Sequence, residues 1–329
     1  MTELAALVCR ECRSDGEGSL ILRSRAHPCR DEAGPFHVKR DDELSFGVSG
    51  TKYRRFASLI PALLAGGVQR LVVCGGLRAN FPLAAAQLFT EAGLEVHLVL
   101  RRPAAAAAGP GVNGALLPLL VPRPRLHLTD GPPDKDAALL QQRLEEEHGG
   151  PVPLLPEGGI HPGAMAGALS LLTDIRRNET VAGHPFEGIW MDAGTGFGAG
   201  AVLAGLRWSG LRRRLNVVLL AGAADGVLRH AARVEAWLVG QSGRPSLQPG
   251  LQADFHRPAQ QRSFGAVGPA VRQAVHRMAA LGILTDPVWS GKFFMTLAGR
   301  PPARGRVLAV HSGGALSLSG FPGMLEKGD

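Results

Sequence analysis

The chain has 329 residues, of which 45% are hydrophobic and 19% are charged, and its net charge is +8. This length and composition exclude a disordered chain and suffice for one large domain or two domains around a shared cleft. No apolar run reaches the roughly 18–20 residues of a membrane span, and Met1 to Arg30 lacks the pattern of a signal peptide, so we expect a cytoplasmic protein that does not enter the membrane.

The positive charge comes mostly from arginine, with runs at Arg54-Arg55, Arg101-Arg102 and Arg212-Arg213-Arg214. A basic balance can indicate a nucleic-acid surface or an anionic ligand. Aromatic residues are only 5% of the chain, however, and no stripe of aromatic and basic residues is present for stacking bases. We therefore interpret the arginines as solvated faces and expect no nucleic-acid partner.

The cysteines are few, and two of them form the CxxC motif Cys9-Arg-Glu-Cys12, with His27 and Cys29 downstream. Such a set could bind zinc. There is no second CxxC, however, and the spacing fits no common zinc module. We interpret these residues as reduced structural thiols and expect no metal.

The first half of the chain alternates between strand-like and helix-like segments. We predict strands at Phe36–Arg40, Arg70–Cys74 and Val96–Leu100, and helices at Arg54–Ala65 and Pro82–Ala92. This βαβ rhythm predicts a parallel sheet with buried strands.

The second half continues this pattern after a low-complexity segment, Arg102 to Gly114, that we interpret as a loop or a loosely formed helix. Helices are predicted at Asp134–Glu147, Gly163–Arg177, Ala201–Trp208 and Pro269–Leu281, and strands at Gly188–Asp192, Leu215–Ala221 and Arg306–His311.

Glycine-bearing turns follow three of the predicted strands, at Gly75-Gly76, Gly194 to Gly200 and Gly313-Gly314. Ligands bind at the carboxyl ends of parallel strands, so these turns converge on one cleft if the strands are neighbours. The turn Gly194 to Gly200 lies between a strand and a helix, where glycine backbone and helix N–H groups suit a phosphate. A tight turn without a ligand is the alternative. The spacing matches neither a Walker motif nor a dinucleotide fingerprint.

Lys52 stands between a turn of small residues and the start of a predicted helix, in Ser49-Gly-Thr-Lys-Tyr-Arg-Arg55. A lysine taken alone is usually a solvated surface residue. Here cationic neighbours and partial burial would lower its pKa toward the neutral amine that a Schiff base requires.

Six segments in chain order resemble the motifs of one family, the 1-aminocyclopropane-1-carboxylate deaminases and D-cysteine desulfhydrases. These are fold type II pyridoxal-phosphate enzymes, akin to the tryptophan synthase β chain. The resemblance covers roughly Phe36 to Phe321. The segments are Lys39–Asp42 with Gly50–Arg55, Val72–Asn80, Pro156–Gly159, Ala193–Gly200, Leu284–Lys292 and Val307–Gly314.

The resemblance implies a role for individual residues toward pyridoxal 5′-phosphate. Lys52 would hold the cofactor as a Schiff base and later move the substrate proton, and Asn80 would hydrogen-bond the phenolic oxygen. Ser312 would lie near the pyridine nitrogen, where a hydroxyl tolerates an unprotonated ring and gives a weaker electron sink than a carboxylate. The phosphate would bind at Gly194, Thr195, Gly196, Phe197, Gly198 and Ala199.

Four positions depart from the family pattern in the expected substrate pocket. Ala79 replaces the serine before the asparagine, and Phe81 replaces a polar residue after it. Trp289 replaces a tyrosine, and Ser290 replaces the deaminase's glutamate, so both side chains credited with ring opening are missing. Arg78 could bind a substrate carboxylate or could equally be a surface arginine.

The implied fold is α/β with two domains, in which twisted, mostly parallel sheets are flanked by helices and the cofactor lies in the cleft. The large domain would comprise residues 1–55 and 164–329, and residues 56–163 would form a small inserted domain. Fold type II enzymes are usually dimers, so a homodimer is also expected.

The implied activity is α-proton removal from a small amino acid, followed by β-elimination to a keto acid and ammonia, as in D-cysteine desulfhydrase. The departures from the family pattern favour an alternative, a homologue that keeps the cofactor without ordinary lyase activity. It would have a divergent substrate or a binding or regulatory role. A weaker alternative is a binder of phosphate or nucleotide without a Schiff base.

Overall fold

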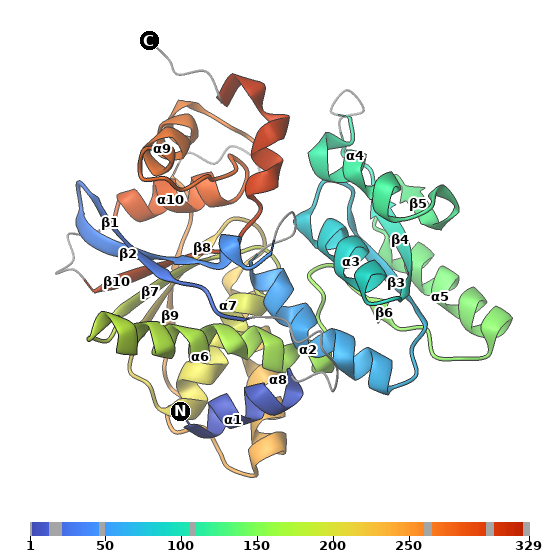
Figure 1. Ribbon diagram of the computed structural model, residues 1–329, viewed down its shortest axis with the longest axis horizontal. Coiled ribbons are helices and arrows are strands. Elements are labelled where there is room, and N and C mark those ends of the chain that lie inside the picture. The colour runs from blue at the N-terminus through green and yellow to red at the C-terminus, as the bar shows by residue number, and fades with distance from the viewer. Residues whose placement is uncertain are drawn as a thin grey trace.

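The computed structural model describes residues 2–12, 22–45, 50–104, 109–259, 265–300 and 306–324. These residues form two sheets, each flanked by helices (Figure 1), which confirms the predicted α/β class. The larger sheet has the strand order β1-β2-β10-β7-β8-β9 and the smaller sheet the order β5-β4-β3-β6. All strands pair in parallel except the antiparallel pair of β1 and β2.

The predicted strands are all present. Both faces of the strand Arg70–Gly76 in the smaller sheet are buried, which explains its continuous run of apolar residues. Leu71 and Val73 pack in the main core on one face, and Val72 and Cys74 pack under the helix Asp134–His148 on the other. The strands are β1 (Ala26–Asp31), β2 (Gly34–Arg40), β3 (Arg70–Gly76), β4 (Glu95–Arg101), β5 (Leu126–Thr129), β6 (Leu154–Leu155), β7 (Gly188–Ala193), β8 (Arg214–Leu219), β9 (Ala253–His256) and β10 (Val307–His311).

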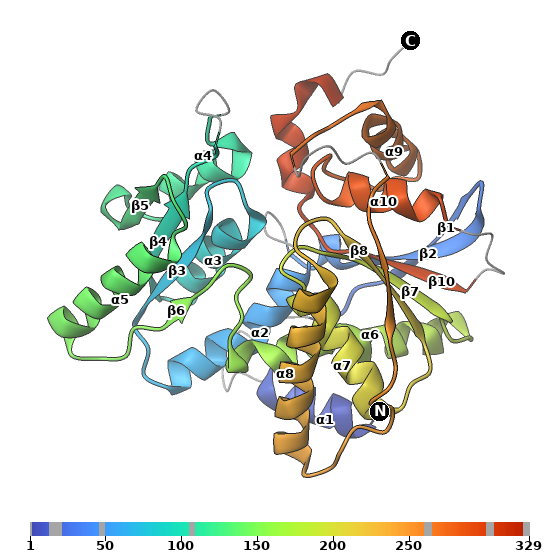
Figure 2. The same ribbon diagram turned by 180° about the vertical axis from the view of Figure 1, so that it is seen from behind.

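The helices cover both faces of each sheet. In Figures 1 and 2, α9 and α10 lie on one face of the larger sheet, and α6, α7 and α8 lie on the other. The predicted helices are present, whereas α1, α4, α8 and α10 were not predicted. The helices are α1 (Thr2–Glu11), α2 (Thr51–Ala65), α3 (Asn80–Glu91), α4 (Gly111–Leu120), α5 (Asp134–His148), α6 (Met165–Ala182), α7 (Phe197–Ser209), α8 (Ala224–Ser242), α9 (Pro269–Ala280) and α10 (Ser290–Ala298).

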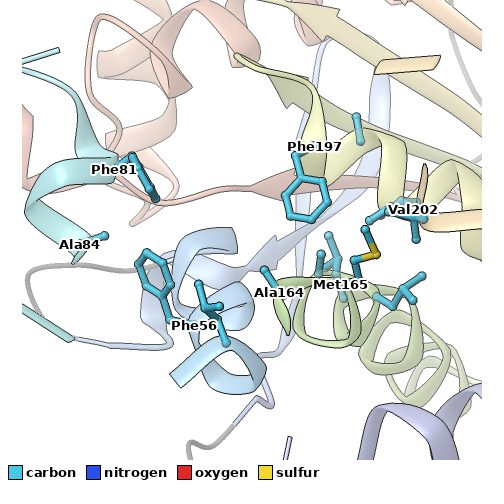
Figure 3. Close-up of a cluster of buried hydrophobic side chains, with 14 of the residues drawn as sticks. Phe56, Phe81, Ala84, Ala164, Met165, Phe197 and Val202 are labelled. Atoms are coloured by element: carbon cyan, nitrogen blue, oxygen red, sulfur yellow. The ribbon is translucent and has the colours of Figure 1, made fainter. Parts of the chain in front are cut away.

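An apolar cluster joins the two sheet units through α2. The ring of Phe56 lies 4.7 Å from that of Phe89 and 6.0 Å from that of Phe81, centroid to centroid. Figure 3 shows Phe56 facing Phe81 of α3, while Met165 of α6 lies beside Val202 of α7. Helix α2 contacts α3 of the smaller sheet unit and α6 of the larger one, so it belongs to both units by its contacts. The division of the chain at residues 55/56 and 163/164 stays a prediction.

The interpretation of Arg54 and Arg55 as a solvated face is wrong, because both side chains are buried. The guanidinium of Arg54 donates to Asp41 at 2.6 Å and to Asp174 at 2.8 Å, and the ammonium of Lys39 also donates to Asp174. These charges are tolerated in the interior because each is paired. The network ties α2, which begins next to Lys52, to β2 and α6.

Gly50, just before α2, has a left-handed conformation with φ +84°. A Cβ atom on it would lie 1.7 Å from the carbonyl oxygen of Ser312, whereas Gly67 has φ +72° and open space around it. We expect Gly67→Ala to cost about 1–2 kcal/mol of unfolding free energy from backbone strain alone. Gly50→Ala should lower the unfolding free energy by about 1–3 kcal/mol more than this, because its methyl group would overlap the carbonyl oxygen of Ser312. Denaturant unfolding measures both, and equal losses would contradict the close approach.

Neither a membrane helix nor a metal cluster is present in the described ranges. No helix there is both long enough and apolar enough to cross a bilayer. No three His, Cys, Asp or Glu side chains in those ranges gather around a possible metal position. Cys9 is exposed and Cys12 and Cys29 are partly buried, and all three are free thiols.

Candidate active site

A cavity of about 100 Å³, partly open to solvent, lies where the two sheet units meet. Its walls come from the carboxyl ends of β7 and β10 in the larger sheet and from the first turns of α2 and α3. Two of the three glycine turns thus follow neighbouring strands, whereas the third pair, Gly75-Gly76, forms the end of β3 in the other sheet. The candidate residues that line the cavity are Lys52, Ala79, Asn80, Phe81, Gly194, Thr195, Gly196, Gly198, Ala199, Trp289 and Ser312.

Lys52 lies in the first turn of α2, with its side chain in the cavity wall. Its pKa is lowered to about 8, because removal from water and the nearby Arg55 guanidinium oppose the charge. The negative charges of Asp192 and Asp286 raise the pKa of Lys52, but by less than burial and Arg55 lower it. A much larger fraction of this amine is therefore neutral at physiological pH than of an ordinary lysine, which suits a nucleophile.

The glycine-rich turn between β7 and α7 forms a concave backbone surface. Gly196 has φ +88°, and a Cβ on it would lie 2.9 Å from the side chain of Val227. The amide of Gly200 donates to Gly196 at 2.8 Å, the first bond of α7. The amides before it have no acceptor within the helix, and they lie at the positive end of the helix dipole. This geometry can hold a phosphate group.

Arg55, which sequence analysis did not single out as a site residue, adds a buried cation to this turn. Its guanidinium lies 5.2 Å from the ring centroid of Phe197, and a Cβ on Gly198 would be 3.2 Å from one of its nitrogens. It donates to the carbonyl of Gly158 at 2.7 Å, whereas its buried Nε has no hydrogen-bond partner. The available signal was its position three residues after Lys52, which places both side chains on one face of a helix.

Burial lowers the pKa of Arg55 to about 10, against the opposing influence of Asp192. A desolvated cation with an unused donor favours an anionic ligand such as phosphate.

Asn80 begins α3 and reaches the cavity from the smaller sheet unit. Its carbonyl oxygen accepts hydrogen bonds from Asn113 at 2.8 Å and from Ser317 at 3.4 Å. Its amide nitrogen faces Gly314, where an added Cβ would lie 2.6 Å away. Because its oxygen is occupied by these bonds, Asn80 keeps its amide N–H groups as donors, which an interaction with an anionic oxygen requires. Sequence analysis did not single out Asn113.

Asp286 holds the part of the wall that carries Trp289, and His311 holds the turn after β10. Asp286 accepts the backbone N–H of Trp289 at 2.7 Å, and the indole of Trp289 packs against Gly194, where a Cβ would meet it at 2.9 Å. His311 contacts the carbonyl of Leu284 at 2.8 Å, and its Nδ1 accepts the amide of Gly313 at 3.2 Å. Because both ring nitrogens are engaged with backbone groups, His311 supports the turn after β10.

Two predicted residues lie outside the cavity wall. Arg78 is exposed and donates to the carbonyl of Gly109 at 2.8 and 3.0 Å. The ring of Phe197 is buried in the core beneath Arg55. The structure thus brings Ala79, Phe81 and Trp289 to the cavity but directs Arg78 away from it.

The fold and the interdomain cavity define the structural class, which is the two-domain α/β fold of fold type II pyridoxal-phosphate enzymes. The solved "ACC deaminase homologue" superimposes with a TM-score of 0.82, covering 99% of both chains at 19% identity. Diaminopropionate ammonia lyase of Escherichia coli superimposes with a TM-score of 0.63 at 15% identity, covering 98% of this chain and 90% of that one.

Among curated proteins, the chain is similar to 1-aminocyclopropane-1-carboxylate deaminases over most of its length. It is 25% identical to that of Methylobacterium nodulans over 303 residues, which cover 87% of this chain and 88% of the relative. It is 26% identical to that of Mesorhizobium japonicum over 306 residues, again 87% and 88% of the two chains. No family model matches the chain. The resemblance stated from the six motifs is confirmed by these similarities.

Proposed function

We propose that this chain is a pyridoxal 5′-phosphate-dependent lyase that acts on a small amino acid. The reaction would remove the α-proton and a substituent on the β-carbon, and addition of water would then release ammonia and a keto acid. The observation that carries this proposal is a lysine with a lowered pKa and an anion-binding helix terminus with a buried arginine, facing the same cavity.

The residues of the cavity fit the cofactor at both of its ends. The amine of Lys52 would bind its aldehyde, and the turn from Gly194 to Ala199 would bind its phosphate with help from Arg55 and its unused Nε donor. Asn80, whose oxygen is engaged by Asn113, would donate from its amide nitrogen to the phenolic oxygen. When bound, the cofactor delocalises the electron pair left at the α-carbon once the proton is removed.

Lys52 has a second task after the substrate has displaced it, which is to take the α-proton on its Nζ atom. A pKa of about 8 suits this work, because the amine accepts a proton readily and is not fully charged beforehand. Phe81 and Trp289 exclude water from the apolar side of the cavity, which strengthens the electrostatic interactions within it.

The same wall residues support a second candidate function, a cofactor-binding homologue without ordinary lyase activity. Ala79 and Trp289 both line the cavity, and neither can supply the hydroxyl group that the family places there. Such a protein would act on a divergent substrate or serve as a binding or regulatory protein. A homodimer and a cytoplasmic location remain proposals, testable by sedimentation and cell fractionation.

A substrate screen separates the two functions. The purified protein, loaded with cofactor, is assayed for keto acid and ammonia with D-cysteine, D-serine and 1-aminocyclopropane-1-carboxylate. We expect turnover of a β-substituted amino acid at roughly 1 s⁻¹ or faster, within the usual range of enzymes. We expect poor turnover of the cyclopropane substrate, because Trp289 and Ser290 lack the family's side chains at those positions. No turnover of any amino acid, with cofactor bound, would favour the second function.

A further inference from the structure

Asn113, in the first turn of α4, is a buried asparagine that does not itself line the cavity. Its amide nitrogen donates to the backbone carbonyl of Arg78 at 3.0 Å and to the side-chain oxygen of Asn80 at 2.8 Å. Its own side-chain oxygen is buried and has no hydrogen-bond partner in the described part of the chain. An unpartnered buried acceptor costs free energy, so the contribution of this residue lies in its two N–H groups.

These bonds determine which end of the Asn80 amide is available to a ligand. A backbone carbonyl can only accept, so the atom of Asn113 that meets the carbonyl of Arg78 has to be the nitrogen. The same nitrogen meets Asn80, and the atom of Asn80 at that contact is therefore the oxygen. The hydroxyl of Ser317 also donates to this oxygen, at 3.4 Å. The nitrogen of Asn80 is thus the end that remains for a ligand in the cavity, which Asn80 lines.

Helix α4 packs closely against α3 and the turn before it (Figure 1). A Cβ on Gly111 would lie 3.3 Å from the side chain of Arg78. A Cβ on Gly114 would lie 2.9 Å from the side chain of Leu77. Glycine at both positions lets the helix approach this turn more closely than larger residues would. The close approach holds Asn113 within hydrogen-bond distance of the start of α3.

We propose that Asn113 is a positioning residue, which fixes the amide of Asn80 so that its nitrogen meets the phenolic oxygen of the cofactor. This inference rests on the proposed function. With the amide turned over, its oxygen would face the phenolic oxygen, and two acceptors repel each other unless the phenolic oxygen keeps a proton. A donor at this place instead favours the ionised oxygen, because a hydrogen bond to the charged form stabilises it.

The test is a double-mutant cycle, read from the absorbance of the bound cofactor. By ordinary cofactor chemistry, the form with an ionised phenolic oxygen absorbs at about 410–430 nm and the form with a protonated oxygen at shorter wavelength. Asn80→Leu should lower the ratio of the long-wavelength to the short-wavelength band by about tenfold or more, as the loss of a hydrogen bond to a charged group implies. Asn113→Leu should lower this band ratio in the wild type, but not further in Asn80→Leu, because it acts through Asn80.

Two single variants sharpen the test. Asn113→Asp replaces the donor by an acceptor of the same shape, so it should turn the amide of Asn80 and lower the band ratio more than Asn113→Leu does. Asn216→Leu is the matched control, because Asn216 is a buried asparagine that contacts His256 at 3.0 Å and does not line the cavity. This control should leave the band ratio unchanged.

The outcomes distinguish this inference from the proposed function. Borohydride trapping of cofactor on Lys52, followed by peptide mapping, is performed on each sample first. Absence of trapping in the wild type refutes both proposals. Trapping in the wild type with an unchanged band ratio in Asn113→Leu and Asn113→Asp overturns only the role of Asn113. An effect of Asn113→Leu that is equally large in the Asn80→Leu background does the same. If Asn113→Leu does not fold or Asn80→Leu does not hold the cofactor, a lower band ratio in Asn113→Asp than in Asn216→Leu supports the role, and equal ratios overturn it.

Discussion

Lys52→Ala should abolish covalent attachment of the cofactor and lower turnover by about 10³-fold or more, because the variant loses both its nucleophile and its proton acceptor. The absorbance band of the bound cofactor, at about 410–430 nm by ordinary cofactor chemistry, should disappear. Lys135→Ala is the matched control, since Lys135 is exposed on α5 and does not line the cavity. A band retained in Lys52→Ala would exclude Lys52 as the attachment site.

The pH dependence of attachment provides a further check on Lys52. Its pKa of about 8 lies below the ordinary lysine value, so the reactive neutral amine should accumulate as pH rises from 6 to 9 and then level off. Arg55→Met removes a charge that lowers this pKa, so the curve should move to higher pH. Pyridoxal without a phosphate is the probe, because it separates the amine from phosphate binding. A curve centred above pH 10 in the wild type would contradict the lowered pKa.

Asp174→Ala should cost about 3–5 kcal/mol of unfolding free energy, because it leaves the buried charges of Lys39 and Arg54 without one of their partners. Denaturant unfolding of the protein measures the loss. The control is Asp130→Ala, which breaks an exposed pair with Arg102 and should cost no more than about 1 kcal/mol. Similar losses in the two variants would mean that the buried network contributes little.

The contribution of Asp174 also has a definite pH dependence. Although burial opposes the charge, Lys39 and Arg54 hold the pKa of Asp174 below its usual range. The folded protein thus binds this proton less readily than the unfolded chain does. The stabilisation is present above the ordinary carboxyl pKa and is lost as pH falls through the lowered native value. Wild-type stability should therefore decline more steeply in acid than that of Asp174→Ala, and equal acid slopes would contradict this assignment.

The elements that sequence analysis predicted are those with strong local patterns. Strand β3 is a short, mostly apolar run that ends in glycine, and β7 is another, followed directly by Gly194. A buried strand of this kind can be recognised from its own residues and the turns that flank it. By contrast, α10 was not predicted, because it is short and follows Asp286-Pro-Val-Trp289, whose turn is held by bonds to the Asp286 side chain. The propensities of the residues themselves do not predict a turn that is held by side-chain hydrogen bonds.

The amino-acid sequence was enough to indicate Lys52, the glycine-rich turn at Gly194 to Gly200 and the α/β class, because each depends on residues adjacent in the chain. The burial of Arg55 and the orientation of Asn80 by Asn113 became visible only in the folded chain. Burial and charge pairing depend on residues far apart in sequence, and a run of arginines looks the same whether it faces water or a ligand. Folding brings these residues to one cavity and thereby determines their chemistry.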